Sequence, residues 1–587
     1  MVIEPSPLRR CLVSMAKILL TTFLILSTAA AVTAQSEFAP RTMLKPRIPG
    51  PYTIAPNVDA RTGYDTLGSR AGINMVYHPD FKADTAVLLR IEGQTFFDIM
   101  DKFSTQTGNF WFAWDSKTVI VAPDNLATRR DLEPLVFKIF YLNPSLRTED
   151  VANIANTLRV QQQLRSFWVA PSAKAITIHG NASTIETAER LISELSLQAL
   201  PLNASSPLRF AAIDRSLVWL ADNGTVRRIV PATQAHMEKM LAGSVAIDMN
   251  ASPASIYENL VIRAGMNVIV DRAVREKPAS RFHVEGVDLI NALDLLALQT
   301  ATFWQPINDS TIHVMADTQQ NRRDREVMQV KVIYLPNTAT TTTLNETLNV
   351  LRTAFSMRGI YQGEKQKAIV VKDTPLRLFV AEKAITDLTK QLGKLTSITF
   401  SSGNNLIAEN GWLLTNAANA RDKLDVQLRS RTTIRLNETP RAAFTALADL
   451  AGLKLAENST IREEAEVPFN LYNVDILDAL DLFAWQTRHF IQVIDEHTIR
   501  VVPDTLQVRR ELEPMIDRTI PPADPEAAPG LLNILRTAFA LRQIQLDEKN
   551  AFVIRDTAGN VALAEKLIEL LGTAGPPGPA DSAAPNR

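Results

Sequence analysis

Seven histidines are the side chains in this sequence best suited to bind a metal ion. They are His78, His179, His236, His283, His313, His489 and His497. A zinc site on a helix would need two histidines one turn apart, as in His-x3-His, and that spacing does not occur. His283 and His313 share one internal repeat, yet neither recurs at the matching positions of the other copies. We therefore expect no metal site and no cofactor.

Catalytic nucleophiles and acids are equally scarce. The one cysteine, Cys11, lies in an N-terminal segment that we expect to be removed, and neither a G-x-S-x-G nor a Walker motif occurs. Asp101, Asp294 and Asp481 recur on one predicted helix, but each lies beside its apolar stripe. A local hydrogen bond or a solvated position explains them better than catalysis, which would need a second acid across a cleft. We expect no enzymatic activity.

Paired arginines recur three times, within PDNLATRRDLEP, ADTQQNRRDREV and PDTLQVRRELEP. A guanidinium group can bind the carboxylates or phosphates of a partner. The stronger alternative is internal pairing with acids that follow, such as Asp131 and Glu511, which would fix the angle between two modules. The middle copy is the most positive, so its Arg322, Arg323 and Arg325 are the cations that we expect to bind a protein partner.

Aromatic residues gather in three predicted hairpins, with turns at Asp115-Ser116, Asp309-Ser310 and Glu496-His497. Packing in the core is the default role for such residues. Any that face outward would form an edge or patch to which an extended partner could add a strand. The candidates for this contact are Trp111, Trp114 and Trp304.

These residues belong to a three-fold repeat. Gly72, Gly265 and Gly452 align within SRAGINMVYHPD, IRAGMNVIVDRA and DLAGLKLAENST, at offsets of 193 and then 187 residues. The Gln-Thr pairs that begin at 106, 299 and 486 obey the same two offsets, as do the arginine pairs. Agreement at several separated points indicates three copies of one unit of about 190 residues.

Each unit divides into two small modules. The first module is predicted as a strand, a helix ending at the shared glycine, two strands, a second helix and a closing hairpin. Thr95, Asp288 and Asp475 are positioned to cap the second helix in the three copies. The second module reads as strand, helix, two strands, helix, which would cover a small sheet on one face. The predicted fold class is α+β: tandem sheet-plus-helix modules in three repeats of a two-module unit.

These patterns divide the chain into eleven segments. The first modules are predicted at 59–127, 244–316 and 431–503, and the second modules at 135–198, 328–394 and 515–572. Linkers are expected at 35–58, 199–243 and 395–430, a signal peptide at 1–34 and a disordered Pro-rich tail at 573–587.

The N-terminus has the composition of a secretory signal. Arg9, Arg10 and Lys17 precede the apolar run ILLTTFLILSTAAAV, and Val-Thr-Ala at 32–34 resembles a cleavage site. An uncleaved anchor is the alternative, and translation could start at Met1 or Met15. No later segment has the 18 or more apolar residues of a membrane-spanning helix.

Charge and composition limit the partners. The chain has 62 basic and 63 acidic residues, so no overall field favours nucleic acid or an anionic bilayer. A hydrophobic content of 46% is that of folded soluble protein. The only G-x-x-G strings lie in the tail, outside any second module, which also disfavours RNA.

The order of elements resembles the N-terminal region of secretins. The first module resembles the secretin and TonB short N-terminal domain (STN domain), and the second resembles the KH-like ring-building domain that follows it. The helix-ending glycine before a short strand and the xPDxxxxRR joint carry the resemblance. It implies modules in the periplasm that bind envelope partners and help to stack subunits into a ring beneath an outer-membrane pore.

Two departures qualify this expectation. The pore domain of a secretin would follow the last module, and only the tail follows here. The modules also alternate, whereas secretins usually carry the short domain once, so a ring and a linear adaptor are both open. We expect a non-catalytic protein-binding scaffold in the periplasm or at the outer membrane, serving a type II secretion or type IV pilus-like secretin system. The alternative is a TonB-linked or signalling receptor module that senses a ligand.

Overall fold

The computed structural model describes most of residues 44–572. The expected signal peptide at 1–34 and the tail at 573–587 lie outside the described residues. Within 44–572 the description omits 89, 133–134, 143–145, 163–166, 172–173, 181–184, 186, 189, 193–207, 214–215, 221–225, 228–242, 309, 327, 355–356, 358, 364–366, 390–391, 394, 402–405, 408–412, 415–423, 429, 513–514, 523, 540 and 542.

The first module contains the predicted elements in all three units, with additional strands in unit one and an additional short helix in unit two. Unit one contains β1 (Tyr52–Ile54), β2 (Val58–Asp59), α2 (Ala60–Ala71), β3 (Asn74–Tyr77), β4 (Ala86–Val87), β5 (Ile91–Gly93), α3 (Phe96–Thr107), β6 (Asn109–Ala113) and β7 (Thr118–Pro123). Unit two contains β14 (Ser244–Ala251), α8 (Pro253–Arg263), β15 (Asn267–Val270), α9 (Arg272–Arg275), β16 (Ser280–Asp288), α10 (Leu289–Thr300), β17 (Thr302–Asn308) and β18 (Thr311–Ala316). Unit three contains β25 (Thr432–Glu438), α15 (Pro440–Ala451), β26 (Lys454–Leu455), β27 (Val467–Val474), α16 (Ile476–Gln486), β28 (His489–Asp495) and β29 (Thr498–Pro503).

The residues that define these helices act as predicted except at the end of α8, where Ala264 rather than Gly265 is the C-cap residue. Thr95, Asp288 and Asp475 each accept a hydrogen bond from a backbone N–H in the first turn of α3, α10 and α16, which satisfies a donor that the helix leaves unpaired. Gly72 and Gly452 end their helices with positive φ values of 67° and 74°, a left-handed conformation that glycine adopts without strain. The apolar faces of the three helices are buried against the sheets.

The second modules are small antiparallel sheets covered by helices. Unit one contains β8 (Leu135–Tyr141), α5 (Thr148–Gln162), β9 (Phe167–Ala170) and β10 (Ala175–Gly180). Unit two contains β19 (Gln329–Tyr334), α12 (Thr341–Ala354), β20 (Gly359–Gly363), β21 (Ala368–Asp373) and α13 (Pro375–Leu388). Unit three contains β30 (Met515–Ile520), α18 (Ala528–Phe539), β31 (Gln543–Leu546), β32 (Phe552–Thr557) and α19 (Ala558–Gly572). Helices α4 (Leu126–Leu132), α11 (Gln319–Arg325) and α17 (Leu506–Leu512) join the two modules of each unit.

The stretches expected as linkers also form structure. Tyr52 in β1 is 1% exposed, and β1 pairs with β5, so the first module begins before residue 59. Strands β11 (Leu208–Ile213), β12 (Ser216–Leu220) and β13 (Val226–Arg227) extend the sheet of unit one at its β8 edge. Strand β22 (Thr396–Ser401) pairs with β19 along its whole length, and β23 (Leu406–Ile407) pairs with β24 (Leu413–Leu414). These strands satisfy edge hydrogen bonds that sequence periodicity alone did not reveal.

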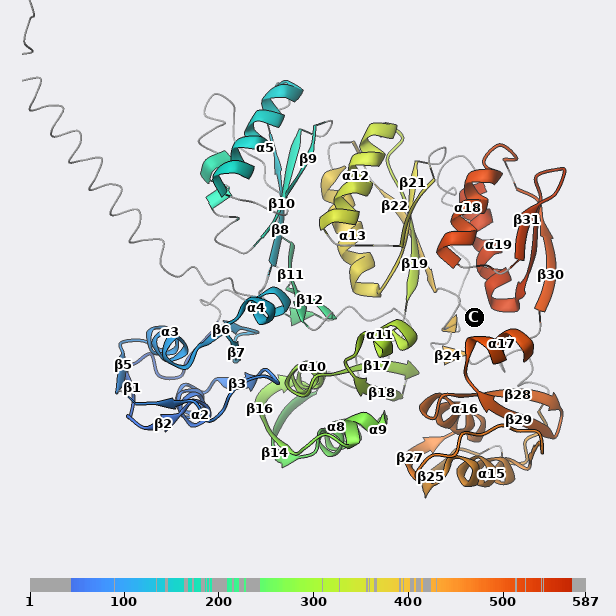
Figure 1. The fold of residues 1–587 in the computed structure, drawn as a ribbon, viewed down its shortest axis with the longest axis horizontal. Coiled ribbons are helices and arrows are strands. Elements are labelled where there is room, and N and C mark those ends of the chain that lie inside the picture. The colour runs from blue at the N-terminus through green and yellow to red at the C-terminus, as the bar shows by residue number, and fades with distance from the viewer. Residues whose placement is uncertain are drawn as a thin grey trace, which may run out of the picture.

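The six modules form two parallel rows (Figure 1), and the chain crosses from one row to the other within each unit. The cores continue from unit to unit. One hydrophobic cluster joins the first modules of units one and two, and another brings Ile269 and Ile307 of unit two into the core of unit three. In the other row, strand residues of unit one pack with α12 and α13, and strand residues of unit two pack with α18 and α19.

The architecture is therefore α+β, as predicted, with many small sheets and their helices. Among the described residues, no helix is long and apolar enough to cross a membrane.

Candidate protein-binding site

The three tryptophans predicted to contact a partner are buried. Trp111, Trp114 and Trp304 are 0%, 1% and 2% exposed. The Nε1–H groups of Trp111 and Trp304 donate to Asp101 and Asp294 at 3.0 and 2.9 Å. The recurring acids of the main helix therefore form local hydrogen bonds in units one and two, and the predicted outward aromatic patch does not include these tryptophans. Indole rings at these strand positions fill the core because they supply large apolar area and one donor that Asp satisfies.

The arginines of the middle joint are also internal. Arg322 donates to Asp317 at 2.8 and 3.0 Å and to Glu326 at 2.9 Å, and it is 7% exposed. Burial disfavours its charge, but the two carboxylates outweigh that cost and raise the pKa of Arg322. Arg325 is 7% exposed, and its guanidinium lies 4.0 Å from the centre of the Trp485 ring.

Arg322 is thus paired internally, with Asp317 before it in the sequence and Glu326 after it. Arg129 of unit one likewise pairs with the upstream Asp124. Arg323 lies in α11, but its side chain is outside the described part of the structure. Arg322 and Arg325 are therefore unavailable to an outside partner, because buried carboxylates and the Trp485 ring already occupy their guanidinium groups.

An asparagine at one repeated position clamps each unit to the next. Asn74 of unit one donates to the carbonyl of Glu285 at 3.2 Å and accepts from its N–H at 2.9 Å. Asn267 of unit two makes the same pair with Tyr472 of unit three, at 3.1 and 2.8 Å. Asn74 and Asn267 are 193 residues apart, and Glu285 and Tyr472 are 187 apart, so both contacts follow the repeat. A primary amide has the donor and acceptor needed to match a strand backbone.

A tryptophan completes each of these two joints. At the first, Trp114 of unit one donates to Asn291 at 2.6 Å, and Asn291 donates to Asp115 at 2.8 Å. At the second, Trp485 of unit three donates to Nδ1 of His313 at 2.9 Å. Nε2 of His313 lies 2.6 Å from Asp271, so His313 carries its proton on Nε2 and presents Nδ1 as an acceptor.

Charged groups also support the second joint. Arg488 of unit three donates to Asn321 of unit two at 2.9 Å. Burial pushes the pKa of Asp271 upward, but His313, Arg325 and Arg488 outweigh it and hold that pKa below its ordinary value. Asp271 therefore stays ionised between the two units.

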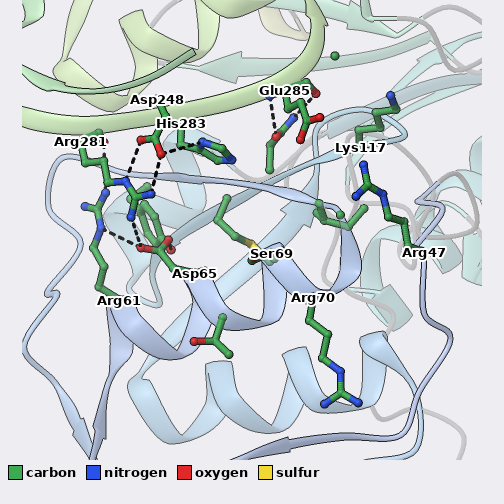
Figure 2. Close-up of a pocket in the computed structure, with 18 of the residues that line it drawn as sticks. Arg47, Arg61, Asp65, Ser69, Arg70, Lys117, Asp248, Arg281, His283 and Glu285 are labelled. Atoms are coloured by element: carbon green, nitrogen blue, oxygen red, sulfur yellow. Dashed lines mark hydrogen bonds and ion pairs between the residues drawn. The ribbon is translucent and has the colours of Figure 1, made fainter. Parts of the chain in front are cut away.

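A groove of about 1020 Å³ follows the first joint between units one and two. Helix α2, β3, the segment before them and the hairpin turn at Ser116 and Lys117 form the wall of unit one, and residues of β14 and β16 form the wall of unit two (Figure 2). Six cationic side chains and three carboxylates line it: Lys45, Arg47, Arg61, Arg70, Lys117 and Arg281, with Asp65, Asp248 and Glu285. The lining therefore carries a net charge of +3 before His283 is counted.

One end of the groove is neutralised by its own ion pairs. Arg281 makes a bidentate contact with Asp248 at 3.0 and 2.9 Å, which lowers the pKa of Asp248. Arg61 lies 3.8 Å from Asp65, and Tyr77 donates to Asp65 at 2.5 Å. Burial raises the pKa of Tyr77 well above its usual value, so the phenol keeps its proton. Arg61 also donates to the carbonyl of Arg281 at 3.2 Å, and Arg281 lies 4.0 Å from Asp65, so contacts between the two units hold this end.

The other end carries the cations that have no such partner. Figure 2 shows Arg47 and Lys117 together there, opposite the paired cluster. Lys45, Arg47 and Lys117 are exposed, and among the described residues none of the three has an ion pair. The backbone of Arg47 is fixed by a 2.7 Å hydrogen bond to the carbonyl of Ala71 at the end of α2. This arrangement presents positively charged side chains to a solvent-open groove and suits an acidic ligand.

Unit three does not repeat this charge. Asp425 and Gln427 occupy the positions of Lys45 and Arg47, and their backbone N–H groups make the matching bonds to Glu496 and Ala451. The segment is thus structurally equivalent but not basic. The positions of unit two that correspond to Lys45 and Arg47, 238 and 240, lie outside the described residues.

No group of three or more histidine, cysteine, aspartate or glutamate side chains that could hold a metal ion occurs among the residues that the structure describes.

Comparison with known proteins does not identify a family for this chain. No family model and no curated protein matches the sequence. One solved structure that matches is the atomic model of the Salmonella SPI-1 type III secretion injectisome basal body proteins InvG, PrgH and PrgK.

That match has 12% identity and a TM-score of 0.12, and it covers 56% of this chain and 46% of the other. This chain thus spans less than half the length of the matched one. A similarity at this level carries no argument about fold or function. The resemblance to secretin N-terminal modules stays a prediction from the repeated motifs.

Proposed function

We propose that this protein is a non-catalytic, protein-binding scaffold of an envelope secretion machinery. Its cationic groove between units one and two would bind an acidic segment of a protein partner. The observation that carries the proposal is a set of exposed cations, Lys45, Arg47 and Lys117, at one end of a groove whose other end is neutralised. None of the three has an ion pair with another described residue. A rigid groove lowers the entropic cost of binding because its walls are already positioned.

The finer assignment rests on the repeated motifs. The resemblance to secretin N-terminal modules supports an accessory component of a type II secretion or type IV pilus-like secretin system, in the periplasm or at the outer membrane. The apolar N-terminal segment after Arg9, Arg10 and Lys17 supports export.

The groove is tested by charge reversal. A labelled Ser-Glu repeat peptide should bind the full chain, and binding should weaken as salt rises because the contact is electrostatic. The double variant Arg47→Glu with Lys117→Glu should weaken binding about tenfold or more. Arg441→Glu is the matched control, since it makes the same kind of change at an exposed position outside the groove. Equal binding by all three proteins, or equal binding of a Ser-Lys peptide, would reject the groove.

The cellular role is tested by deletion and complementation. Loss of the gene should impair export by the secretin system, and the wild type and Arg441→Glu should restore it while the groove variant restores it less. Normal export in the deletion strain would reject the secretion role. A changed transcriptional response to an external ligand, with normal export, would favour the receptor alternative.

A further inference from the structure

Units one and two each present one face of the first module to the following unit, and unit three presents the same face uncovered. The hairpin position occupied by Trp114, Ile307 and Ile494 shows this most clearly, because the three residues are related by the offsets of the repeat. Trp114 and Ile307 are 1% and 4% exposed, whereas Ile494 is 50% exposed. No described residue of this chain covers the face around Ile494. We call it the open face.

The clamp residue also changes there. Asn74 and Asn267 are each 5% exposed and paired with the next unit, whereas Lys454 stands at the third position and is exposed. Asp495 occupies the position of Asp115, which accepts a hydrogen bond from Asn291 at the first joint. The open face therefore combines an exposed apolar side chain with one cation and one anion at positions that contact a neighbouring module elsewhere.

The surface that receives such a face lies on the main helix and bulged strand of the following unit. Asn291 and Leu295 are one turn apart on α10, which contacts β3, and Leu295 is fully buried. Leu482 holds the same position on α16 and is 3% exposed. Burial at both positions shows that an apolar residue belongs at the centre of this contact.

Unit one differs from units two and three on this receiving surface. Lys102 stands where units two and three have Leu295 and Leu482. Asp98 stands where unit two has Asn291 and unit three has Asp478. Asp98 and Lys102 form a 3.0 Å ion pair and remain partly exposed. Lys102 also donates to the carbonyl of Glu92 at 2.9 Å. That carbonyl is the equivalent of the Glu285 and Tyr472 carbonyls that the asparagine clamps use, so the clamp acceptor of unit one is already engaged.

The other row ends differently in unit three. Val330 and Val332 of β19 are buried against the helices of unit three. Asp517 and Thr519 occupy their positions in β30 and are exposed, and Asp517 lies 3.8 Å from Arg555. A polar face of this kind ends a row of stacked repeats. At these two positions the row of second modules thus ends in polar side chains, whereas the row of first modules ends at the exposed Ile494.

We propose that the open face of unit three binds a module of the first type that belongs to another polypeptide. Unit one of a second copy is excluded by charge. If it docked as units two and three do, Lys102 would approach Lys454 and Asp98 would approach Asp495. Like charges facing each other oppose the wrong partner and so provide specificity.

The chemistry of the fitting partner follows from the same positions. Its module would carry an acidic or neutral residue where unit one has Lys102, a neutral or basic residue where unit one has Asp98, and an apolar surface for Ile494. This inference takes one premise from the proposed scaffold role, which is that the chain binds another protein.

The test converts unit one into such a partner. A receiving variant carries Asp98→Asn, Lys102→Glu and Ile494→Asp, so that its unit one matches the open face while its own open face is blocked. Asn is the residue that unit two has at the position of Asp98, at the N-terminal end of α10, and Lys102 is exposed, so the fold should be kept, as circular dichroism would check. Mixed with the wild-type chain, this variant should form a 1:1 complex with a dissociation constant on the order of micromolar, measured by sedimentation.

Two controls locate the contact. Ile494→Asp alone should not bind the wild-type chain, because its unit one keeps Asp98 and Lys102. The receiving variant should not bind a chain that carries Ile494→Asp. A folded receiving variant that fails to bind the wild type would overturn the proposal, as would self-association of the wild type that Ile494→Asp abolishes. Either result would leave the export test of the scaffold role unaffected.

Discussion

The two joints between first modules use the same asparagine clamp but opposite tryptophans. At the first joint Trp114 reaches forward from unit one to Asn291 of unit two. At the second, Trp485 reaches backward from unit three to His313 of unit two. The backbone contact that depends on module geometry is thus repeated, whereas the aromatic anchor comes from either side. The shape of the modules determines where two units meet, and individual side chains determine how stable each joint is.

The tryptophans should make the largest contributions. Trp485→Ala should destabilise the joint between units two and three by about 3–5 kcal/mol, since it removes a buried indole, a hydrogen bond to His313 and the ring beneath Arg325. Hydrogen exchange should show faster exchange near His313 and in α16, with little change at the first joint. Trp114→Ala is the matched variant and should affect the first joint instead. Equal effects of both variants at both joints would show that the joints are not independent.

Acid should weaken unit three in a way that units one and two do not share. Burial lowers the pKa of His489 to about 4 from an unfolded value near 6.5, with a further contribution from Arg462. The folded state therefore binds fewer protons than the unfolded state between these values. Its stability is complete above about pH 6.5 and falls toward pH 4, by up to about 3 kcal/mol.

The repeat supplies the control for this pH effect. Asn109 and Thr302 stand at the positions of His489, and all three side chains contact a threonine at the end of the preceding helix. His489→Asn should reduce the loss of stability between pH 6.5 and pH 4, as measured by urea unfolding of unit three. An unchanged pH profile in this variant would assign the acid sensitivity to another group.

The clamps should have a smaller effect. Asn267→Leu removes two hydrogen bonds to Tyr472 and leaves its backbone groups without these partners, at a cost of about 1–3 kcal/mol. Asn74→Leu should cost a similar amount at the first joint. Lys454→Leu, at the third position, should change stability by less than about 0.5 kcal/mol because the side chain is exposed. A large loss in the lysine variant would mean that this position is structural in all three units.

Much of the fold followed from local patterns. Helix caps at Thr95, Asp288 and Asp475 and the helix-ending glycines were predictable because each acts on its own backbone within a few residues. The strands between 199 and 243 and between 395 and 430 were missed. Their register depends on the free edges of β8 and β19, which no local pattern in those stretches reveals.

The candidate site was harder to predict for the same reason. Arg325 and Trp304 carry the charge and aromatic character of binding residues, but their partners come from segments far away in the sequence. The repeat offsets could have revealed the clamps, since Asn occurs at 74 and 267 and Lys at 454. The groove could not be found in this way, because Lys45 and Arg47 of one unit meet Glu285 of the next only after the units stack.

The crossing of the chain between the two rows has a mechanical consequence. Since each unit contributes one module to either row (Figure 1), bending the molecule at one joint in the plane of the rows must open contacts in one row and compress those in the other. The two rows together therefore resist bending in the plane that contains them. A pull on one end would reach the other as a displacement of the whole body rather than as a hinge, which suits a spacer that holds two partners at a set separation.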